Sequence, residues 1–483
     1  MDALLQKIKN AAARKQVKDF EIYLKRSRGL SITVKEQKPD AVENRDSLGF
    51  GLRVCLNGSG NRRLGFSYGR AFDDASLDIV VDQALAAATA ATPDPLYGWP
   101  PGGWSAPAAL PQEKASYPEG TNFDPALSGI TRDDKTAVAC ELEKSALGTD
   151  PRVKRARYTS YEEEVDDTVL FNSSGLLASH RRTHLSLSVL AVAEVGGQSE
   201  EYYEYASTPF FRELKPRPLG RSAAQMAVDL LGGKRIANYR GPVILPPGVA
   251  VSFLEVFAPG ATAENVAKKN SCLIGKMGEK LYSPKITIVD DGLYPGGEES
   301  APFDAEGTPR QKTVIVNRGV VSNLLYDCYW ARRDKKNSTG NSRRASAVAR
   351  PKLEWSNFFI QPAEPVEPVQ PVEPVQPAEK SPDRIAAIDR AIFIAEVIGI
   401  HTADPISGDF SVGMQGFLIE KGKGKKPVRS MALAGNLHEM FAKVVEVGSD
   451  LRFYGRFGAP TLLIEEASVS GEGSHRAPTE QGG

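Results

Sequence analysis

The sequence predicts an α+β protein: an N-terminal α/β region in two parts, followed by a β-rich C-terminal domain with mostly antiparallel sheet. Two observations carry this prediction. Apolar and polar residues alternate along most of the chain, and helical apolar periodicity is confined to a few segments. The length of 483 residues allows two or three domains, each with its own hydrophobic core.

The first domain is predicted over residues 1–112. A charged amphipathic helix leads into "DFEIYLKRSRGLSITVKEQ", which alternates as a hairpin does, and "LGFGLRVCL" with "RRLGFSYGRAF" indicates a second pair of strands. The Ala-rich segment "ASLDIVVDQALAAATAAT" predicts a helix with its large apolar residues on one face. A Pro/Gly-rich passage at residues 93–113 marks the end of this domain.

A middle domain is predicted over residues 113–236 and a C-terminal domain over residues 237–472. The middle domain is interpreted as a helix, antiparallel strands and a second helix, and the C-terminal domain contains a hairpin at "TVIVNRGVVSNLLYD". Proline at every third position predicts that residues 361–382 form an exposed polyproline II insertion, which is either a ligand for a Pro-reading domain or a loop expanded by repeat slippage. Residues 473–483 are predicted to be a disordered tail.

Composition argues against several functional classes. The 60 basic residues balance the 60 acidic ones and no basic block occurs, so the sequence gives no support for binding to nucleic acid or to an anionic membrane. The N-terminus lacks the apolar region of a signal peptide, and no apolar run approaches the roughly 20 residues of a membrane-spanning helix. The four cysteines form no CxxC pair, which favours a reducing compartment and a cytoplasmic location.

Three short stretches imitate catalytic or metal sites. "GFSYG" at residues 65–69 matches the nucleophile elbow Gly-x-Ser-x-Gly, but its alternation predicts a strand instead of the strand-to-helix turn that this motif needs. His180 and His184 of "HRRTH" are four residues apart in a predicted strand, where side chains at that spacing lie about 13 Å apart and cannot share a metal ion. The third stretch, "GLYPGGEESAPFDAEG", lacks the spacing of an EF-hand and is predicted to be an ordered turn. Its carboxylates belong to Glu298, Glu299, Asp304 and Glu306.

The pair His438–Glu439 opens the zinc-peptidase signature His-Glu-x-x-His, but the second histidine would stand at position 442, which is Ala442. The apolar spacing instead predicts an amphipathic helix that is capped by Asn436, with Glu439 reaching back to the N–H of the cap, and that is stopped by Gly448. His438 is then expected on the exposed side of the first turn. The apolar positions are Leu437, Met440, Phe441, Val444 and Val445.

Several longer stretches resemble the TldD/PmbA family, also known as the modulator of DNA gyrase family. They are "LGFGLRV", then "PFDAEGTPRQKTVIVNRGVVSNLLYD" followed by "STG", then "ISGDFSVGMQGFLIEKG" and "MALAGNLHEMFAKVVEVGSDL". The resemblance is clearest over residues 241–471 and weaker over the N-terminal half. It implies a heterodimer of two related subunits that acts as a cytoplasmic zinc peptidase on unfolded peptides, including a microcin-type antibiotic precursor and an antitoxin.

The resemblance also implies where zinc ligands would stand. The catalytic subunit of the family carries a His-Glu-x-x-x-His helix just after the strand that opens its last domain, and a late cysteine ligand. At the matching place this chain reads "VILPPGVAVSFLEVFAPGATAENV", with Glu255 but no histidine, and Ala459 and Pro460 stand where the cysteine is expected. We therefore expect no catalytic or metal-binding residue and no cofactor in this chain, and zinc in the partner subunit.

By this resemblance the chain is expected to be the PmbA/TldE-type subunit, inactive alone and paired with a TldD-like catalytic subunit around an unfolded peptide. Direct contact with nucleic acid or membrane is not expected. Two alternatives stay open: a stand-alone homodimer that binds peptides, and a metal-free hydrolase that would use Ser67 of "GFSYG". The residues that carry the resemblance, either in the peptide cleft or as turns and caps of the fold, are Thr339, Gly340, Gly416, Phe417, Gly435 and Asn436.

Overall fold

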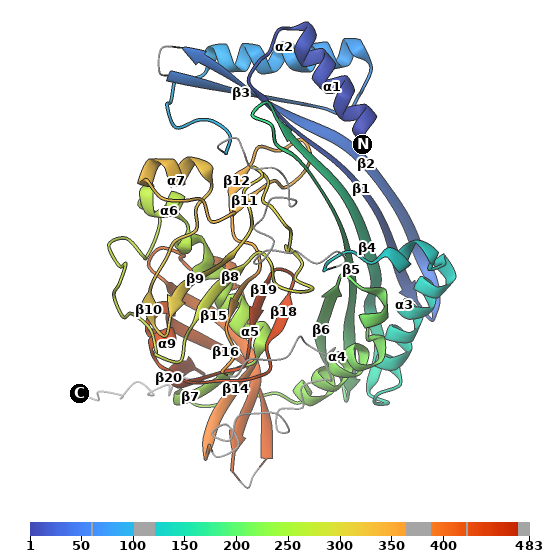
Figure 1. Ribbon diagram of the computed structural model, residues 1–483. Coiled ribbons are helices and arrows are strands. Elements are labelled where there is room, and N and C mark those ends of the chain that lie inside the picture. Colours follow the sequence, from blue (N-terminus) through green and yellow to red (C-terminus); the bar gives the residue numbers. More distant parts are fainter. Residues whose placement is uncertain (59–60, 101–120, 364–387, 422–423, 472–483) are drawn as a thin grey trace, which may run out of the picture.

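A long six-stranded antiparallel sheet, in the order β3-β2-β1-β4-β5-β6, curves along one side of the C-terminal domain (Figure 1). The computed structural model describes residues 1–58, 61–100, 121–363, 388–421 and 424–471. The predicted insertion beyond residue 363 and the predicted tail at 473–483 lie outside the described residues. The strands are β1 (Phe20–Lys35), β2 (Lys38–Gly58), β3 (Asn61–Gly69), β4 (Val153–Asn172), β5 (Leu177–Val195) and β6 (Gln198–Thr208).

Two pairs of helices cover one face of this sheet. Ile22 of β1 belongs to the core beneath α1 (Asp2–Arg14) and α2 (Asp74–Ala90), and Ile32 belongs to the core beneath α3 (Arg132–Leu147) and α4 (Pro216–Leu230). Both residues have even numbers in one continuous strand, so both helix pairs lie on the same face. The odd-numbered Glu21 and Tyr23 point the other way, toward Arg344 of the C-terminal domain. The sheet is therefore the middle layer of three.

The C-terminal domain contains two further six-stranded sheets, in the orders β10-β9-β8-β13-β19-β18 and β16-β15-β14-β7-β20-β17, and most of their neighbouring strands are antiparallel. The predicted fold class is thus confirmed. The strands are β7 (Tyr239–Leu245), β8 (Ile288–Asp291), β9 (Lys312–Asn317), β10 (Val320–Val321), β11 (Ser342–Arg343), β12 (Lys352–Leu353), β13 (Phe358–Ile360), β14 (Arg390–Ile398), β15 (Asp409–Glu420), β16 (Gly424–Asn436), β17 (Val444–Val447), β18 (Arg452–Tyr454), β19 (Phe457–Ala459) and β20 (Leu462–Ser470).

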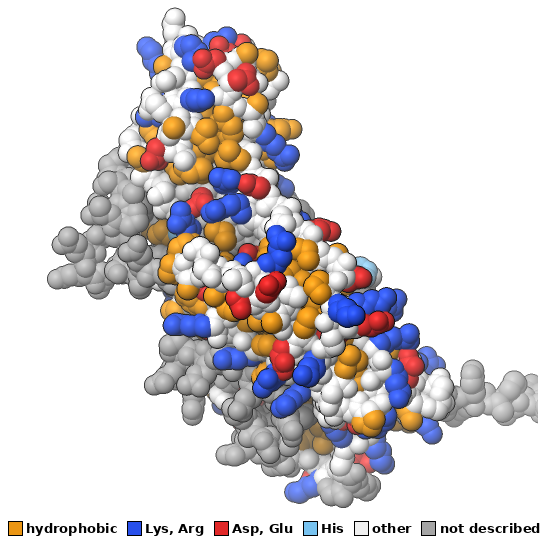
Figure 2. Space-filling view, turned by 90° about the vertical axis from the view of Figure 1, so that its right-hand side faces the viewer, with side chains coloured by type: hydrophobic (Ala, Val, Ile, Leu, Met, Phe, Trp, Pro, Cys, Tyr) orange, Lys and Arg blue, Asp and Glu red, His pale blue; other side chains and the backbone are white. Residues whose placement is uncertain are grey.

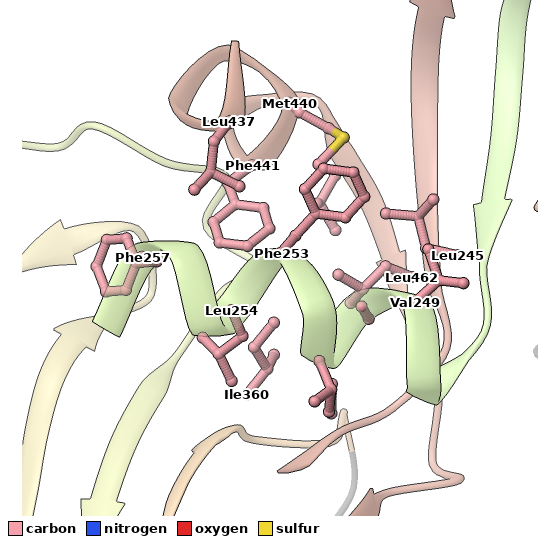
Figure 3. Close-up of a cluster of buried hydrophobic side chains, with 14 of the residues drawn as sticks. Leu245, Val249, Phe253, Leu254, Phe257, Ile360, Leu437, Met440, Phe441 and Leu462 are labelled. Atoms are coloured by element: carbon pink, nitrogen blue, oxygen red, sulfur yellow. The ribbon is translucent and has the colours of Figure 1, made fainter. Parts of the chain in front are cut away.

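Helix α5 (Pro247–Phe257) runs through the core between these two sheets, and it contacts β7 and β14 of one and β13, β18 and β19 of the other. Figure 3 shows Phe253 and Phe257 directed into a cluster that also contains Phe441. The rings of Phe257 and Phe441 have centroids 6.3 Å apart, close enough for a favourable aromatic contact. The remaining helices in the described part of this domain are η4 (Ala258–Ala261), α6 (Ala263–Ala267), α7 (Cys328–Asp334), η5 (Ile400–Thr402) and α9 (Leu437–Ala442).

The hairpin predicted within residues 19–37 is wrong, because β1 is one uninterrupted strand over that stretch. It is hydrogen-bonded to β2 along one edge and to β4 along the other, and these two ladders keep the middle of the strand extended. The chain turns only at Glu36 and Gln37, which both have positive φ, 54° and 61°. The strands predicted for "GFSYG" and "HRRTH" are confirmed as β3 and β5, and the hairpin at Arg318 and Gly319 is confirmed between β9 and β10.

The helix predicted after Asn436 is too long. Asn436 does cap α9, and its Oδ1 accepts from the N–H of His438 at 2.9 Å, but the helix ends at Ala442. The apolar residues that follow form β17, which pairs with β20, so tertiary pairing overrides the helical spacing, and Gly448 follows a strand. His438 is half-buried instead of exposed, because Tyr282 covers it and the tyrosine hydroxyl lies 3.1 Å from Nδ1.

Charged residues are interspersed on the surface. Figure 2 shows basic and acidic side chains mixed over one face of the molecule, as the neutral net charge leads one to expect. In the part of the chain that the structure describes, no helix combines the length and apolar character needed to cross a membrane. The cysteines are free thiols: Cys55, Cys140, Cys272 and Cys328.

Candidate functional site

Helix α5 begins directly after β7, which opens the C-terminal domain, and Glu255 is its exposed carboxylate. A His-Glu-x-x-x-His series aligned on Glu255 would place imidazoles at positions 254 and 259. Position 254 holds Leu254, whose side chain is fully buried in the core (Figure 3), and position 259 holds Pro259 of η4. Neither side chain has an atom that can coordinate a metal ion, so these residues do not fit zinc.

The later position, where a cysteine ligand would stand, holds Ala459 at the end of β19 and Pro460 after it. Although Glu255 is exposed on the surface of α5, partial desolvation by the surrounding protein raises the pKa of its carboxyl group, and the positive charge of Arg456 partly opposes that rise. Arg456 itself is held in place: its Nη1 lies 2.9 Å from Glu354 Oε2, and its guanidinium stacks on Trp355 at 4.9 Å from the ring centroid. Within the described ranges, no group of three His, Cys, Asp or Glu side chains is arranged to hold a metal ion.

A cavity of about 460 Å³, the larger cavity, lies between the long sheet and the C-terminal domain. Its volume is in the range of small-molecule and peptide side-chain sites. One wall comes from β5, β6 and the start of α4, and the opposite wall comes from residues 293–298 and 451–455. Its lining combines apolar, polar and charged side chains, including Thr183, His184, Phe210, Glu298, Arg452 and Phe453.

One ion pair and one longer polar approach connect the two sides of the larger cavity. Nη2 of Arg452 in β18 lies 2.6 Å from Oε2 of Glu204 in β6, and the same nitrogen donates to the carbonyl oxygen of Tyr205 at 2.8 Å. Nδ1 of His184 lies 3.8 Å from Oε2 of Glu298. Because both contacts join the long sheet to the C-terminal domain, the two walls are held in a fixed relation to each other.

A buried ionic network away from this cavity joins the same two parts of the chain. Glu21 of β1 accepts from Arg53 Nε at 2.8 Å and from Arg344 Nη2, and Arg53 Nη1 donates to Glu306 Oε1 at 3.1 Å. All four side chains are at most 7% exposed. Buried charges of this kind require complete pairing, so the network fixes how the sheet and the domain meet.

The acidic stretch at residues 298–306 forms turns, as predicted, and three of its four carboxylates have hydrogen-bond or ion-pair partners. Asp304 accepts from three backbone N–H groups, those of residues 306, 308 and 342, each at 2.9 Å. Burial and the charge of Glu306 raise the pKa of Asp304 to about 7. Glu299 lies 3.2 Å from Arg343 Nη2, and the neighbouring arginines lower its pKa to about 2 against the opposing effect of burial. Cys328 is buried and its pKa is raised, so its thiol is not a ready nucleophile.

The six residues that carry the family resemblance lie in three separate places. Thr339 Oγ1 accepts from the N–H of Tyr326 at 2.8 Å and donates to Asn341 Oδ1 at 2.6 Å. Gly340 follows with φ of +74°, and a Cβ there would lie 2.3 Å from the carbonyl oxygen of Pro309. This pair therefore shapes a tight turn beside α7.

Gly416 and Phe417 lie in β15. A Cβ on Gly416 would lie 2.0 Å from the carbonyl oxygen of Phe393 in β14, so only glycine fits at this bulge. Phe417 is 1% exposed and packs on the Phe393 ring at 6.0 Å between centroids. Gly435 pairs with Phe410 across β15 and β16, directly before the cap at Asn436. None of the six lines the larger cavity, and their assignment to a peptide cleft stays a prediction.

Three family models match the chain in order: PmbA/TldA metallopeptidase domain 1 over residues 20–88, the central domain over residues 125–231 and the C-terminal domain over residues 238–471. The chain belongs to the PmbA/TldD family. The extent of the N-terminal domains that we predict from the sequence, with boundaries at residues 112 and 236, stays a prediction, and β1 and β4 join both parts in one sheet.

Members of both branches of the PmbA/TldD family are similar to this chain. Metalloprotease PmbA of Escherichia coli O157:H7 is 23% identical over 455 residues, which are 94% of this chain and 92% of that protein. The metalloprotease TldD homolog of Haemophilus influenzae is 26% identical over 372 residues, 71% of this chain and 73% of that protein. The crystal structure of TldE from Thermococcus kodakarensis has the same fold, with a TM-score of 0.82 at 22% identity over 97% of this chain and 100% of that one.

The sequence of this PmbA/TldD-family chain did not reveal the larger cavity or the buried ionic network between the sheet and the C-terminal domain. The one available signal was a charged residue inside an apolar strand, as for Glu21 between Phe20 and Ile22 and for Arg53 between Leu52 and Val54. That pattern indicates a second, non-core face of the strand. It does not indicate that this face is also buried.

Proposed function

We propose that this chain is the non-catalytic subunit of a TldD/TldE-type heterodimeric zinc metallopeptidase that cleaves unfolded peptides. The proposal rests on the residues around Glu255. Leu254 in α5 and Pro259 in η4 occupy the two positions where imidazole ligands would stand. Without a metal-bound water, Glu255 has nothing to activate as a general base. The zinc and the hydrolytic step then belong to a TldD-like partner subunit.

Similarity to relatives does not separate the two subunit types, because identity to a TldD homolog and to PmbA is nearly equal, 26% and 23%. The side chains at the expected ligand positions support the non-catalytic assignment, since leucine, proline and alanine side chains have no atom that binds zinc. The proposal therefore depends on which side chains stand at positions 254, 259 and 459, and not on the percentage of identity to either relative.

In this role the chain contributes a wall of the peptide cleft. An extended, unfolded peptide is held through main-chain hydrogen bonds at a sheet edge, which accepts many sequences. The larger cavity, with apolar Phe210 and Phe453 and polar His184 and Glu298, has the character of a side-chain subsite along such a cleft. The biological outcome is proteolysis, peptide maturation or antitoxin turnover. Four free cysteines support our further proposal of a cytoplasmic location.

The deciding experiment measures zinc content and cleavage of an unfolded peptide by the purified chain, alone and mixed with a TldD-like protein. The proposal expects no zinc and no cleavage alone, with cleavage on mixing. Glu255→Gln in this chain should leave the mixed activity unchanged, whereas the equivalent change in the partner's His-Glu-x-x-x-His motif should abolish it. Stoichiometric zinc with cleavage by this chain alone would overturn the proposal.

The metal-free hydrolase is disfavoured by the geometry at Ser67. This side chain is 6% exposed, and its Oγ donates to Gln83 Oε1 at 2.9 Å. An amide oxygen is not a base that can activate a serine hydroxyl. The stand-alone homodimer is tested by the same mixing experiment, because it expects peptide binding without any gain of cleavage.

A further inference from the structure

A second, smaller cavity of about 220 Å³ lies between the long sheet and the C-terminal domain, on the other side of Glu298 and Glu299 from the larger cavity. Its sheet wall carries Lys25, Asp166 and Arg182, and its opposite wall comes from residues 299–310 and 342–345. Most of the side chains that line it are polar or charged. A cavity of this composition is suited to a small polar ligand and not to an apolar one.

Most of the charges around the smaller cavity are already paired. Asp166 Oδ2 lies 2.9 Å from Lys25 Nζ and 2.7 Å from Arg182 Nε. Glu299 Oε1 lies 3.5 Å from Arg182 Nη1 and 3.2 Å from Arg343 Nη2. These contacts form a continuous chain of alternating charge across the interface, and each carboxylate in it has at least two cationic neighbours.

Arg310, in contrast to these paired side chains, has no ion-pair partner in the described part of the chain. It is 8% exposed and lines the smaller cavity, yet in the described part of the chain its guanidinium has no hydrogen bond and no ion pair, and its Nε is buried without a partner. Two further lining groups have the same property, since Ser342 Oγ and Arg344 Nε are buried and unpartnered. Native proteins rarely leave buried donors unmet, and an unmet buried guanidinium is especially unfavourable.

We propose that the smaller cavity binds a small oxyanion, with Arg310 as its principal cation and Ser342 as an additional donor. A guanidinium presents two parallel N–H groups that match two oxygens of a carboxylate or a phosphate. The volume of about 220 Å³ is below the range of drug-sized ligand sites, which restricts the occupant to a small anion or to the terminal carboxylate of a peptide. The proposal is independent of the peptidase role.

The competing explanation is that Arg310 only balances the charge of nearby carboxylates at a distance. Arg310 lowers the pKa of Glu299, but this effect ranks behind those of Arg182 and Arg343, which contact Glu299 directly. Asp304 is saturated by three backbone N–H groups. Burial raises the pKa of Asp290, which Arg310 lowers slightly, and this carboxylate accepts from Asn341 Nδ2 and from the N–H and hydroxyl of Ser356. These three carboxylates are therefore satisfied without Arg310, and its own N–H groups still lack acceptors.

The test is a binding titration with two probes at constant ionic strength. One probe is inorganic phosphate, followed by equilibrium dialysis and ³¹P line width, and the other is a short peptide with a free C-terminus, compared with its C-terminal amide. Saturable binding is expected for the wild-type chain and for Arg318→Gln, a control on an exposed turn. Arg310→Gln should weaken it by at least about tenfold, as expected for loss of a charged hydrogen-bond donor.

The two probes distinguish the source of the oxyanion. Binding of phosphate alone identifies a free inorganic anion, and binding of the free-acid peptide but not of its amide identifies a terminal carboxylate. Absence of saturable binding of both probes to the wild-type chain overturns the proposal, and so does unchanged binding by a folded Arg310→Gln variant. If that variant does not fold, Ser342→Ala, which keeps every charge, must weaken binding for the proposal to stand.

Discussion

Replacing Glu21 by alanine should strongly destabilise the protein. The fully buried carboxylate of Glu21 accepts from Arg53 at 2.8 and 2.5 Å and also from Arg344. The substitution leaves Arg344 without an ion pair and Arg53 with Glu306 alone. Breaking a buried pair by removing one partner costs about 3–5 kcal/mol. With an m-value of about 3 kcal/mol/M, the midpoint of urea unfolding should fall by about 1 M or more.

Urea unfolding followed by circular dichroism measures this change. Glu21→Gln keeps the side-chain volume and one acceptor oxygen, so its midpoint should lie between those of Glu21→Ala and the wild type. The matched control is Asp46→Ala, which breaks an exposed pair with Arg26 at 2.6 Å and should leave the midpoint unchanged, because solvent screens such pairs. Equal midpoints for Glu21→Ala and Asp46→Ala would refute the reasoning, because the buried network would then contribute no more than a surface pair.

Three further substitutions test other parts of the structure. A Cβ at Gly416 would lie 2.0 Å from the Phe393 carbonyl oxygen, so Gly416→Ala should lower the thermal midpoint through an overpacking cost of at least about 1–3 kcal/mol; an unchanged midpoint would contradict the close approach. Ser67 is bonded to Gln83 and has no base, so a fluorophosphonate probe should label the wild type and Ser67→Ala equally weakly; labelling lost in the variant would revive the hydrolase. Burial and a neighbouring glutamate raise the pKa of Asp327 to about 7, so the folded state holds a proton that the unfolded chain releases near pH 4. Stability should therefore fall between about pH 4 and pH 7, and Asp327→Asn should flatten that slope in urea titrations; an unchanged slope would reject this assignment.

Much of the fold could be predicted because a strand is indicated by the alternation of apolar and polar side chains over a few consecutive residues. The alternation in "GFSYG" and "HRRTH" concerns residues two apart, and it correctly identified β3 and β5 against the catalytic motifs that these stretches imitate. The same local evidence fails where one spacing suits two structures. Val444 and Val445 continue the predicted apolar face of a helix, yet they lie in strand β17, because β20 supplies hydrogen bonds that no local pattern indicates.

The candidate site was less accessible to sequence reasoning, for a different reason. Glu21 and Arg344 are 323 residues apart, and no repeating pattern in the sequence indicates that they meet. A charged residue in a strand is normally interpreted as solvent-facing, which is correct for a sheet with one covered face. In this chain both faces are covered, one by helices and the other by the C-terminal domain, so the polar side chains on the second face of β1 and β5 are buried or half-buried.

The continuity of the long sheet constrains how this protein can be divided in evolution. Domain 1 and the central domain are matched as two separate units, but β1 pairs with β4 without interruption from Glu21 to Thr33. A chain without either unit would have a sheet with an exposed, unpaired edge strand. Such an edge can pair with strands of other chains and lead to aggregation. The two units therefore complete one sheet, and neither can be removed without exposing an edge strand of the other.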